Sequence, residues 1–311
     1  MTGGVDASKL GALVVLMRLI RIATWPLRKL GLLPAVRHFV QHLLGRYILA
    51  VIPHHKLEDI FQSHFSSKIY DPSTLSRLDK TLKSFLVDSY FYLNEPNRRR
   101  LRSCALAISG TEWAQMYNSR EFPDMESRRV QVWGYLHEII SEGLVGHIHQ
   151  LGASSGREVG WLAKEYPHIQ FSSSDINSNI VAQINSNLIH LDNHKSFKAD
   201  LSEVSDLEAL FDNDIDLLLS SASLQYLTPV EIARIFDKEF NQSRYVLLYE
   251  PLGLGFEQFS SEESIARGNF SWSHPYFYLA ETNGWTIANM DTNFIIRQPW
   301  AKGLSMRIER S

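Results

Sequence analysis

The stretch HQLGASSGREVGWLA (residues 149–163) places a glycine-punctuated turn between an apolar run and a helical pattern. A strand, a tight turn and a helix in this order form an anion- or nucleotide-binding corner in parallel sheets, because the loop and the helix N-terminus point at the ligand. Asp175 follows Gly156 by 19 residues, close to the roughly 20 at which an acid on the next strand reaches ribose hydroxyls. We therefore expect a nucleotide-type site here; the alternative is that the glycines only make a tight turn.

Short apolar runs alternate with helical patterns after Gly143. They are spaced like the strands of a parallel sheet with crossover helices, and two later segments are expected to form a closing pair. The segments are 145–151, 169–175, 196–200, 215–223, 244–251, 285–291 and 304–310. The pattern predicts the α/β class, with a doubly wound, Rossmann-like seven-stranded sheet.

The chain before Gly143 is helical in pattern. Apolar residues recur at spacings of three and four in LSRLDKTLKSFLVDSYFYL and SRRVQVWGYLHEII. We expect a basic amphipathic arm over residues 1–56, an all-helical domain over 57–142 and the sheet domain over 143–311. The basic run NRRRLR (97–102) is typical of a solvated helix face. Because no aromatic-rich basic repeat accompanies it, nucleic-acid binding is not expected.

Charge is distributed unevenly along the chain. Residues 1–57 have eight Lys and Arg against one acid, so the remainder of this protein of net charge −3 bears −10. Three readings of the arm stay open: packing on the main domain, peripheral contact of residues 10–52 with an anionic membrane, and self-association as a homodimer. The apolar run Leu10–Met17 is too short to span a bilayer. With Cys104 as its single cysteine, the chain fits a cytoplasmic location, or the inner membrane face if the arm binds lipid.

Two families share such a glycine loop. A resemblance to short-chain dehydrogenases would require a Tyr-x-x-x-Lys pair, and none of the twelve tyrosines has a lysine four residues later. Residues 143–311 instead resemble class I S-adenosylmethionine-dependent methyltransferases. IHQLGASSGREVGWLA is similar to their first motif, SSSDIN to the second, KADLSE to the third and DIDLLLSSASLQYL to the fourth-strand motif.

The resemblance implies S-adenosylmethionine as cofactor and assigns residues to its parts. Loop residues would face the methionine part, Asp175 with Ile176 the ribose, Asp200 with Leu201 the adenine, and Ser220 or Ser221 the rim. The loop residues are Gly152, Ala153, Ser154 and Gly156. Two positions depart from the family: Gln150 replaces the usual acid and Ser154 the middle glycine. These departures keep open a non-catalytic binding or scaffold protein of the same fold.

The acceptor side is less defined. An oxygen acceptor can use a general base near the methyl group, and the candidates are His274, Glu250 and Tyr226, with capping of the following helix as the alternative for His274. No metal is expected, since His54 and His55 lack carboxylate partners at ligand spacing. LLLSSASLQYLTP and the aromatic loop after it are similar to sugar O-methyltransferases of bacterial glycan clusters. This similarity implies a small-molecule acceptor, a hydroxyl on a sugar or lipid-linked intermediate.

Overall fold

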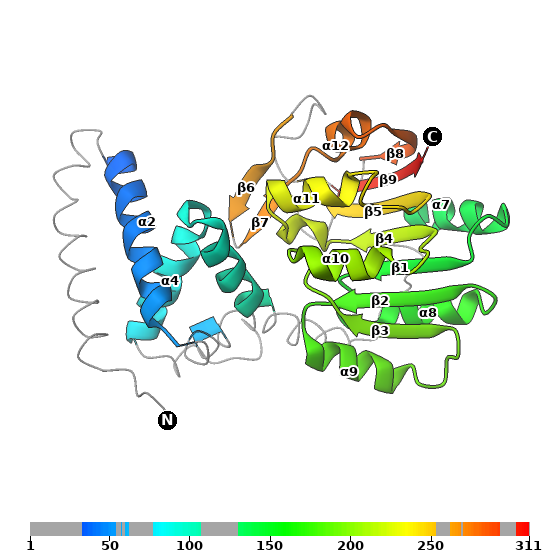
Figure 1. Cartoon of the computed structure of the whole chain (residues 1–311), viewed down its shortest axis with the longest axis horizontal. Helices are drawn as coiled ribbons and strands as arrows, with labels where there is room; N and C mark the ends of the chain where they lie inside the picture. Colours follow the sequence, from blue (N-terminus) through cyan, green and yellow to red (C-terminus); the bar gives the residue numbers. More distant parts are fainter. Residues whose placement is uncertain are drawn as a thin grey trace. The chain divides into compact units, whose positions relative to one another are not determined.

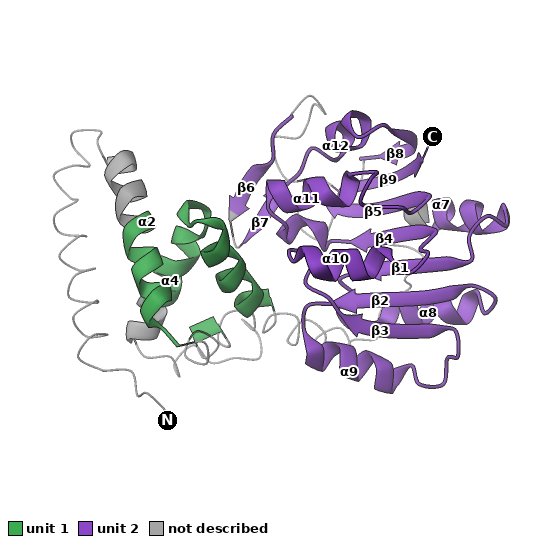
Figure 2. Ribbon diagram, viewed as in Figure 1, with its two compact units in different colours: residues 1–109 green, residues 110–311 purple. Residues whose placement is uncertain are grey.

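A computed structural model describes residues 33–53, 57, 60–61, 77–106, 130–252, 262–268, 270–292 and 303–310, with the backbone alone at 33–41, 77–81, 130–132 and 268. The chain divides into two compact units, residues 1–109 and 110–311 (Figure 2). Unit 1 is helical and unit 2 contains the sheet.

Unit 2 is organised around one seven-stranded sheet (Figure 1). Its strands are β1 (His147–Leu151), β2 (Gln170–Asp175), β3 (His194–Lys198), β4 (Leu217–Ser221), β5 (Tyr245–Pro251), β8 (Trp285–Asp291) and β9 (Gly303–Arg310). They lie in the order β3-β2-β1-β4-β5-β9-β8, the first five parallel and β9 antiparallel to both of its neighbours. The predicted seven-stranded, doubly wound sheet is confirmed, including its closing pair.

Helices cover both faces of this sheet. Helices α10 (Val204–Phe211), α11 (Pro229–Phe236) and α12 (Tyr276–Thr282) pack on one face. Helices α7 (Val130–Ser141) and α8 (Arg157–Glu165) pack on the other, while α9 (Ser178–Asn187) contacts β2 and β3. The chain leaves β1 toward β2 and β3 and returns to β4 on the opposite side of β1. The carboxyl ends of β1 and β4 therefore form the switch point at which such sheets bind ligands.

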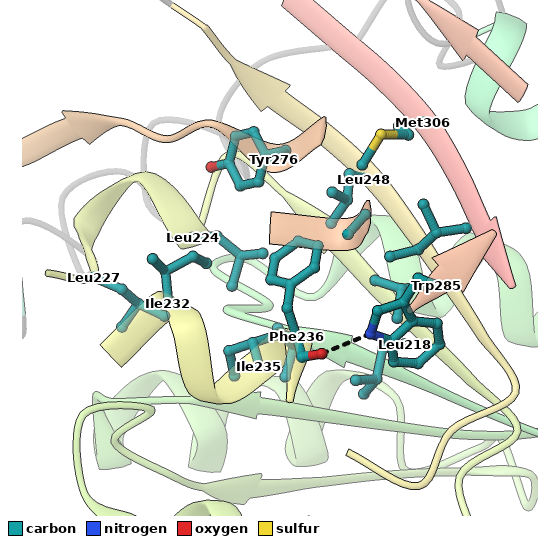
Figure 3. Packing of buried hydrophobic residues seen from close by; sticks show 14 of the residues in the cluster. Leu218, Leu224, Leu227, Ile232, Ile235, Phe236, Leu248, Tyr276, Trp285 and Met306 are labelled. Atoms are coloured by element: carbon teal, nitrogen blue, oxygen red, sulfur yellow. Dashed lines mark hydrogen bonds between the residues drawn. The ribbon is translucent and has the colours of Figure 1, made fainter. Parts of the chain in front are cut away.

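The first face has an apolar core that fixes the last helices. Phe236 and Tyr276 pack with Leu248 and Met306 of the central strands, all of them buried (Figure 3). The indole Nε1 of Trp285 donates to the Phe236 carbonyl at 2.6 Å, as the dashed line in Figure 3 marks. This bond satisfies one of the carbonyls that the end of α11 leaves unpaired.

The boundary between the units differs from the predicted one after residue 142. Helix α7 packs on β5 and β9, and its buried Trp133, Leu136 and Ile139 belong to the core of the second face. Residues 130–141 therefore belong to the sheet unit, because their apolar stripe is buried there.

Unit 1 consists, in its described part, of helix α2 (Leu33–Val51), helix α4 (Arg77–Ser89), the short η2 (Tyr90–Tyr92) and helical residues 95–106. Helix α2 packs on α4 and η2. A Cβ at Gly45 would lie 2.9 Å from Leu93 and 3.2 Å from the Ser89 Cβ, so this contact needs glycine. The second half of the predicted arm thus packs within unit 1. The predictions for the apolar run Leu10–Met17 concern residues outside the described part of the chain.

The basic run 97–102 is only partly solvated. Arg98 and Arg99 pair with Glu95 at 2.9 and 3.4 Å. Arg100 instead donates to the carbonyls of Leu49 and Ile52, the latter at 2.8 Å, and Arg102 is buried. The expectation of a solvated helix face is wrong for these two arginines, because they contribute to the interior of unit 1.

None of the described helices combines the length and apolar character that crossing a bilayer needs.

A histidine and serine network lies between β1 and β2 where a parallel sheet usually has aliphatic side chains. The two ring nitrogens of His149 lie 2.8 Å from Ser172 Oγ and 2.9 Å from Ser174 Oγ. His147 Nε2 reaches the same Ser172 hydroxyl at 2.7 Å. Burial of His149 lowers its pKa to about 3, with the charges of His147 and His194 as smaller causes, so the ring is neutral in the folded protein.

This low pKa predicts that acid destabilises unit 2. Below pH 6.5, the ordinary pKa of histidine, His149 binds a proton in the unfolded chain but not in the folded protein. The contribution of His149 to the free energy of unfolding is therefore lost as the pH falls from about 6.5 toward 3. The raised pKa of buried Glu250 acts in the opposite direction. Denaturant unfolding at pH 7 and pH 5 should therefore show a pH dependence that is weaker in His149→Gln by up to about 1.4 kcal/mol per pH unit. The exposed His168→Gln is the control, and an unchanged slope in His149→Gln contradicts the assignment.

Candidate active site

The turn between β1 and α8 contains three left-handed residues. Gly152, Ser154 and Gly156 have φ of 66°, 51° and 71°. Gly156 is the N-cap of α8, and the Ala153 amide donates to the Ser174 carbonyl of β2 at 2.9 Å. The predicted strand, turn and helix are confirmed. Ser154, where the resemblance leads us to expect a glycine, has a left-handed φ of 51°, a conformation that glycine adopts without steric cost.

Asp175, at the end of β2, holds this loop. Its Oδ2 accepts from the Ser154 amide at 3.0 Å and its Oδ1 from the Asn177 amide at 3.0 Å. Burial raises its pKa, while hydrogen bonds from the amides of Asn177, Ser154 and Ile176 act against that shift. A carboxylate has about four acceptor positions. The two strong amide bonds fix the group and leave part of its capacity for a donor from a ligand.

A side chain at either of two loop glycines, Gly152 and Gly156, would collide with another part of the chain. A Cβ on Gly152 would lie 2.3 Å from Ser223 Oγ, and one on Gly156 would lie 2.7 Å from Ile184. Because Gly152 has no side chain, the turn after β4 can pack against it, and α9 can pack against Gly156 for the same reason. These contacts explain both glycines by packing, while the approach of the loop to a ligand stays a prediction.

Ser223 joins the ends of β1 and β4. Its Oγ lies 2.9 Å from the Leu151 carbonyl and 3.3 Å from those of Gly152 and Ser221. A hydroxyl donates one hydrogen bond at a time, so this spot is rich in carbonyl acceptors. Sequence reasoning missed Ser223, since only the folded chain brings it over the loop.

The position of the family's first acid is also rearranged. Gln150 Nε2 donates at 2.8 Å to Glu158 Oε2, and both side chains are buried. The carboxylate absent from residue 150 is thus supplied from the first turn of α8. Gln150 Oε1 has no partner within the described part of the chain.

The predicted adenine contacts lie beyond β3. Asp200 and Leu201 are partly buried, and Asp200 Oδ1 accepts from the Ser202 amide at 3.0 Å and its hydroxyl at 2.6 Å. The expected strand over 196–200 is found at 194–198. Both residues therefore lie in the turn after the strand end and keep an exposed part, and their contact with adenine stays a prediction.

Glu250 lies at the end of β5 and is fully buried. Its Oε1 accepts from Ser220 Oγ at 2.6 Å, the Ser223 amide at 2.9 Å and the Leu224 amide at 3.1 Å. Burial raises its pKa, against the effect of these bonds. Ser220 is sealed against Glu250, so of the two predicted rim serines only Ser221 keeps an exposed part.

His274 is buried beside the same carboxylate layer. Its Nδ1 lies 2.8 Å from Ser264 Oγ, and its ring meets Tyr276 edge-on at 5.7 Å. Helix α12 begins after Pro275 with no side-chain cap, so the capping alternative is wrong. Burial, aided by the charge of Arg267, lowers the pKa of His274 to about 3. Of the three predicted catalytic residues only Tyr226 is partly exposed.

A short antiparallel hairpin of β6 (Ile265–Gly268) and β7 (Ser271–Ser273) replaces the predicted aromatic loop. Strand β7 contacts η3 (Leu224–Tyr226), the turn after β4. Arg267 of this hairpin donates to Gln225 Oε1 at 2.5 Å. Neither residue was predicted, because a lone arginine and a lone glutamine give no sequence signal.

Across the residues that the structure describes, no three His, Cys, Asp or Glu side chains gather as metal ligands.

No protein-family model and no curated protein matches the sequence. Among solved structures, the magnesium protoporphyrin IX methyltransferase from Synechocystis PCC 6803 with bound SAH is 14% identical with a TM-score of 0.47, covering 66% of this chain and 96% of that one. The N-methyltransferase NodS from Bradyrhizobium japonicum WM9 is 12% identical with a TM-score of 0.45, covering 65% and 98%. The PH0226 protein from Pyrococcus horikoshii OT3 is 12% identical with a TM-score of 0.45, covering 63% and 99%.

These likenesses are too low to assign an activity, so the class rests on the sheet itself. The order β3-β2-β1-β4-β5-β9-β8, with the antiparallel strand β9 between β5 and β8, is that of the Rossmann-like methyltransferase fold. Strand order and the loop after β1 thus agree with the class that the sequence motifs indicate.

Gly152→Ala should destabilise the turn that joins β1 to α8. The added Cβ collides with Ser223 Oγ at 2.3 Å, and φ of 66° strains any side chain. We expect a loss of about 1–3 kcal/mol in the free energy of unfolding, measured in denaturant. The double variant Gly152→Ala, Ser223→Gly should regain part of it, whereas Gly146→Ala, where the nearest atom is 3.5 Å away, should change little. No rescue by the double variant would refute the contact.

Ser154→Gly should have the opposite effect. Left-handed φ costs a non-glycine residue roughly 1–2 kcal/mol, and glycine removes this cost at an entropic penalty of about 0.5–1 kcal/mol. A net gain of up to about 1 kcal/mol, seen as a higher Tm, is expected. Ser155→Gly, at a position without positive φ, is the matched control and should lower Tm. Equal effects of the two changes would argue against strain at Ser154.

Proposed function

We propose that the chain transfers a methyl group from S-adenosylmethionine to a hydroxyl of a small-molecule acceptor, a sugar or a lipid-linked intermediate. The proposal depends above all on the bond between the Ser154 amide and Asp175, 3.0 Å long. This bond joins the loop after β1 to the acid of β2 at the sheet's switch point, where doubly wound sheets bind nucleotides.

The residues present fit this cofactor. Asp175 keeps acceptor capacity for ribose hydroxyls, with Ile176 beside it. We assign Asp200 and Leu201, in the turn after β3, to contact with the adenine. The carbonyls of Leu151, Gly152 and Ser221 meet around Ser223 Oγ, and such a group of acceptors suits an ammonium. When bound, S-adenosylmethionine supplies a methyl group on a sulfonium that is displaced in line.

On the acceptor side, the candidate residues are better suited to positioning the substrate than to general-base catalysis. A base works best with a pKa near the working pH, and the pKa of His274 is far below it. Glu250 is sealed and already accepts three hydrogen bonds. We therefore assign His274 and Glu250 to positioning of the turn after β4, and Tyr226 to contact with the acceptor. The end of β4 reads Ser220-Ser221-Ala222-Ser223 and lacks the Asn/Asp-Pro-Pro-Tyr motif that favours amino acceptors.

A second candidate is a non-catalytic scaffold of the same fold. The observation in its favour is Ser223, whose hydroxyl occupies the space above Gly152 and fills the carbonyl cluster with a protein group. In that case the cofactor would bind weakly or not at all.

Calorimetric titration with S-adenosylmethionine and S-adenosylhomocysteine separates the two candidates. We expect affinity on the order of micromolar, about −8 kcal/mol, weakened at least about tenfold in Asp175→Ala because a buried charged acceptor is lost. Asp175→Asn keeps the shape and tests the charge, and the exposed Asp212→Ala is the control. Absence of binding to the wild type would overturn the methyl-transfer proposal and favour the scaffold.

A further inference from the structure

Arg267 lies one short turn away from the proposed cofactor loop. Ser223 contacts Gly152, and Gln225, two residues later, accepts the Arg267 Nη2 bond at 2.5 Å. Gln225 is itself held in place, because its Nε2 donates to the Ala222 carbonyl at 2.8 Å. The arginine therefore contacts the turn after β4 through Gln225.

The guanidinium of Arg267 lacks an ion pair and part of its hydrogen bonds. Its Nε is buried without a hydrogen-bond partner, its Nη2 is bonded to a neutral amide, and no carboxylate of the described chain pairs with it within 4.0 Å. The residue as a whole remains partly exposed. A partly desolvated cation without an ion pair is costly, and its planar donor fork matches a carboxylate or phosphate.

The surrounding groups do not neutralise this charge directly. His274 is neutral because burial lowers its pKa, and the nearby Tyr276 hydroxyl is uncharged because burial raises its pKa. The charge of Glu250 acts on Arg267 through space, but no hydrogen bond or ion pair joins the two side chains. Glu250 Oε1 accepts from Ser220 and two amides of the turn, and its Oε2 has no hydrogen-bond partner within the described residues. Arg307 offers a comparison within the same unit: it pairs with Glu309 at 2.5 Å, Glu138 at 3.4 Å and Glu142 at 3.5 Å. Arg267 is thus a cation whose partner must come from outside the described chain.

We propose that Arg267, oriented by Gln225, binds an acidic group, a carboxylate or a phosphate, on the methyl acceptor. The inference rests on the proposed function and deepens it: the substrate is an acidic molecule, such as a uronic acid or a sugar phosphate. The acid is held beside Tyr226, while the hydroxyl to be methylated faces the cofactor loop across the turn after β4.

The test follows the arginine Nε–H signals of labelled protein by NMR during titration with inorganic phosphate and, separately, with acetate. The Arg267 signal is identified by its absence from Arg267→Lys. We expect it to shift saturably with millimolar phosphate or acetate, and not with chloride at equal ionic strength. The stronger of the two anions identifies the acidic group. Arg244→Lys, an exposed arginine at the start of β5, should leave the response unchanged.

A second variant keeps the test decisive if the lysine variant folds poorly. Gln225→Glu places a carboxylate beside the guanidinium, and it should weaken phosphate binding at least about tenfold, because a charge-assisted pair forms within the protein. An Arg267 signal that does not move, or that moves equally with chloride, overturns the inference.

Calorimetry with S-adenosylhomocysteine on the same samples separates the two proposals. Cofactor binding without an anion response overturns only the acidic acceptor. An anion response without cofactor binding overturns methyl transfer and leaves Arg267 as an anion site. Unchanged cofactor affinity in Gln225→Glu, together with lost phosphate binding, supports an acceptor role for the arginine.

Discussion

One carboxylate oxygen, Glu250 Oε1, ties the carboxyl ends of the two central strands β4 and β5 together. It accepts one hydroxyl and two backbone amides inside a fully buried layer. A buried charge is tolerated only when such donors surround it, so the turn after β4 has little freedom to move. Ala222, at φ of 57°, shows how tightly that turn is wound. The positions of Ser223 over the loop and of Gln225 against Arg267 both follow from this one anchor.

The other wall of the site is built by the same physical device. Asp175 holds the amides of Ser154 and Asn177 as Glu250 holds those of Ser223 and Leu224. In both cases a side-chain carboxylate at a strand end captures backbone donors that would otherwise need water. The loops on either side of the switch point are therefore preorganised before any ligand arrives, which lowers the ordering cost of binding.

Sequence patterns predicted what depends on local chemistry. Apolar runs such as Leu217–Leu219 and the acid after β2 identified strands and their ends, because parallel strands are buried on both faces. The cofactor loop and Asp175 were likewise brought together as expected. Thr228 begins α11 with a capping box, a local sequence device, in which the Glu231 carboxylate accepts from the Thr228 amide at 2.7 Å.

What the sequence did not predict depends on contacts between distant segments. Helical periodicity cannot tell which unit buries α7, and the three-residue β7 is too short and polar for a strand signal. The packing of Ser223 against Gly152 joins residues 71 positions apart. Ser220 and Ser221 are adjacent in sequence, yet only strand geometry decides which of them is sealed. Arg267 could not be found because its significance lies in the absence of an ion pair with a described carboxylate, which a sequence does not display.

The placement of β9 between β5 and β8 has a consequence for the protein during its synthesis. Strand β5 is complete at residue 251, but its second neighbour comes from residues 303–310. All seven residues of β5 are buried in the finished sheet. Until that late segment emerges from the ribosome, a long apolar strand has an open edge that can pair with other chains. Pairing with β9 closes that edge, so the last strand of the chain protects β5 from association with other chains.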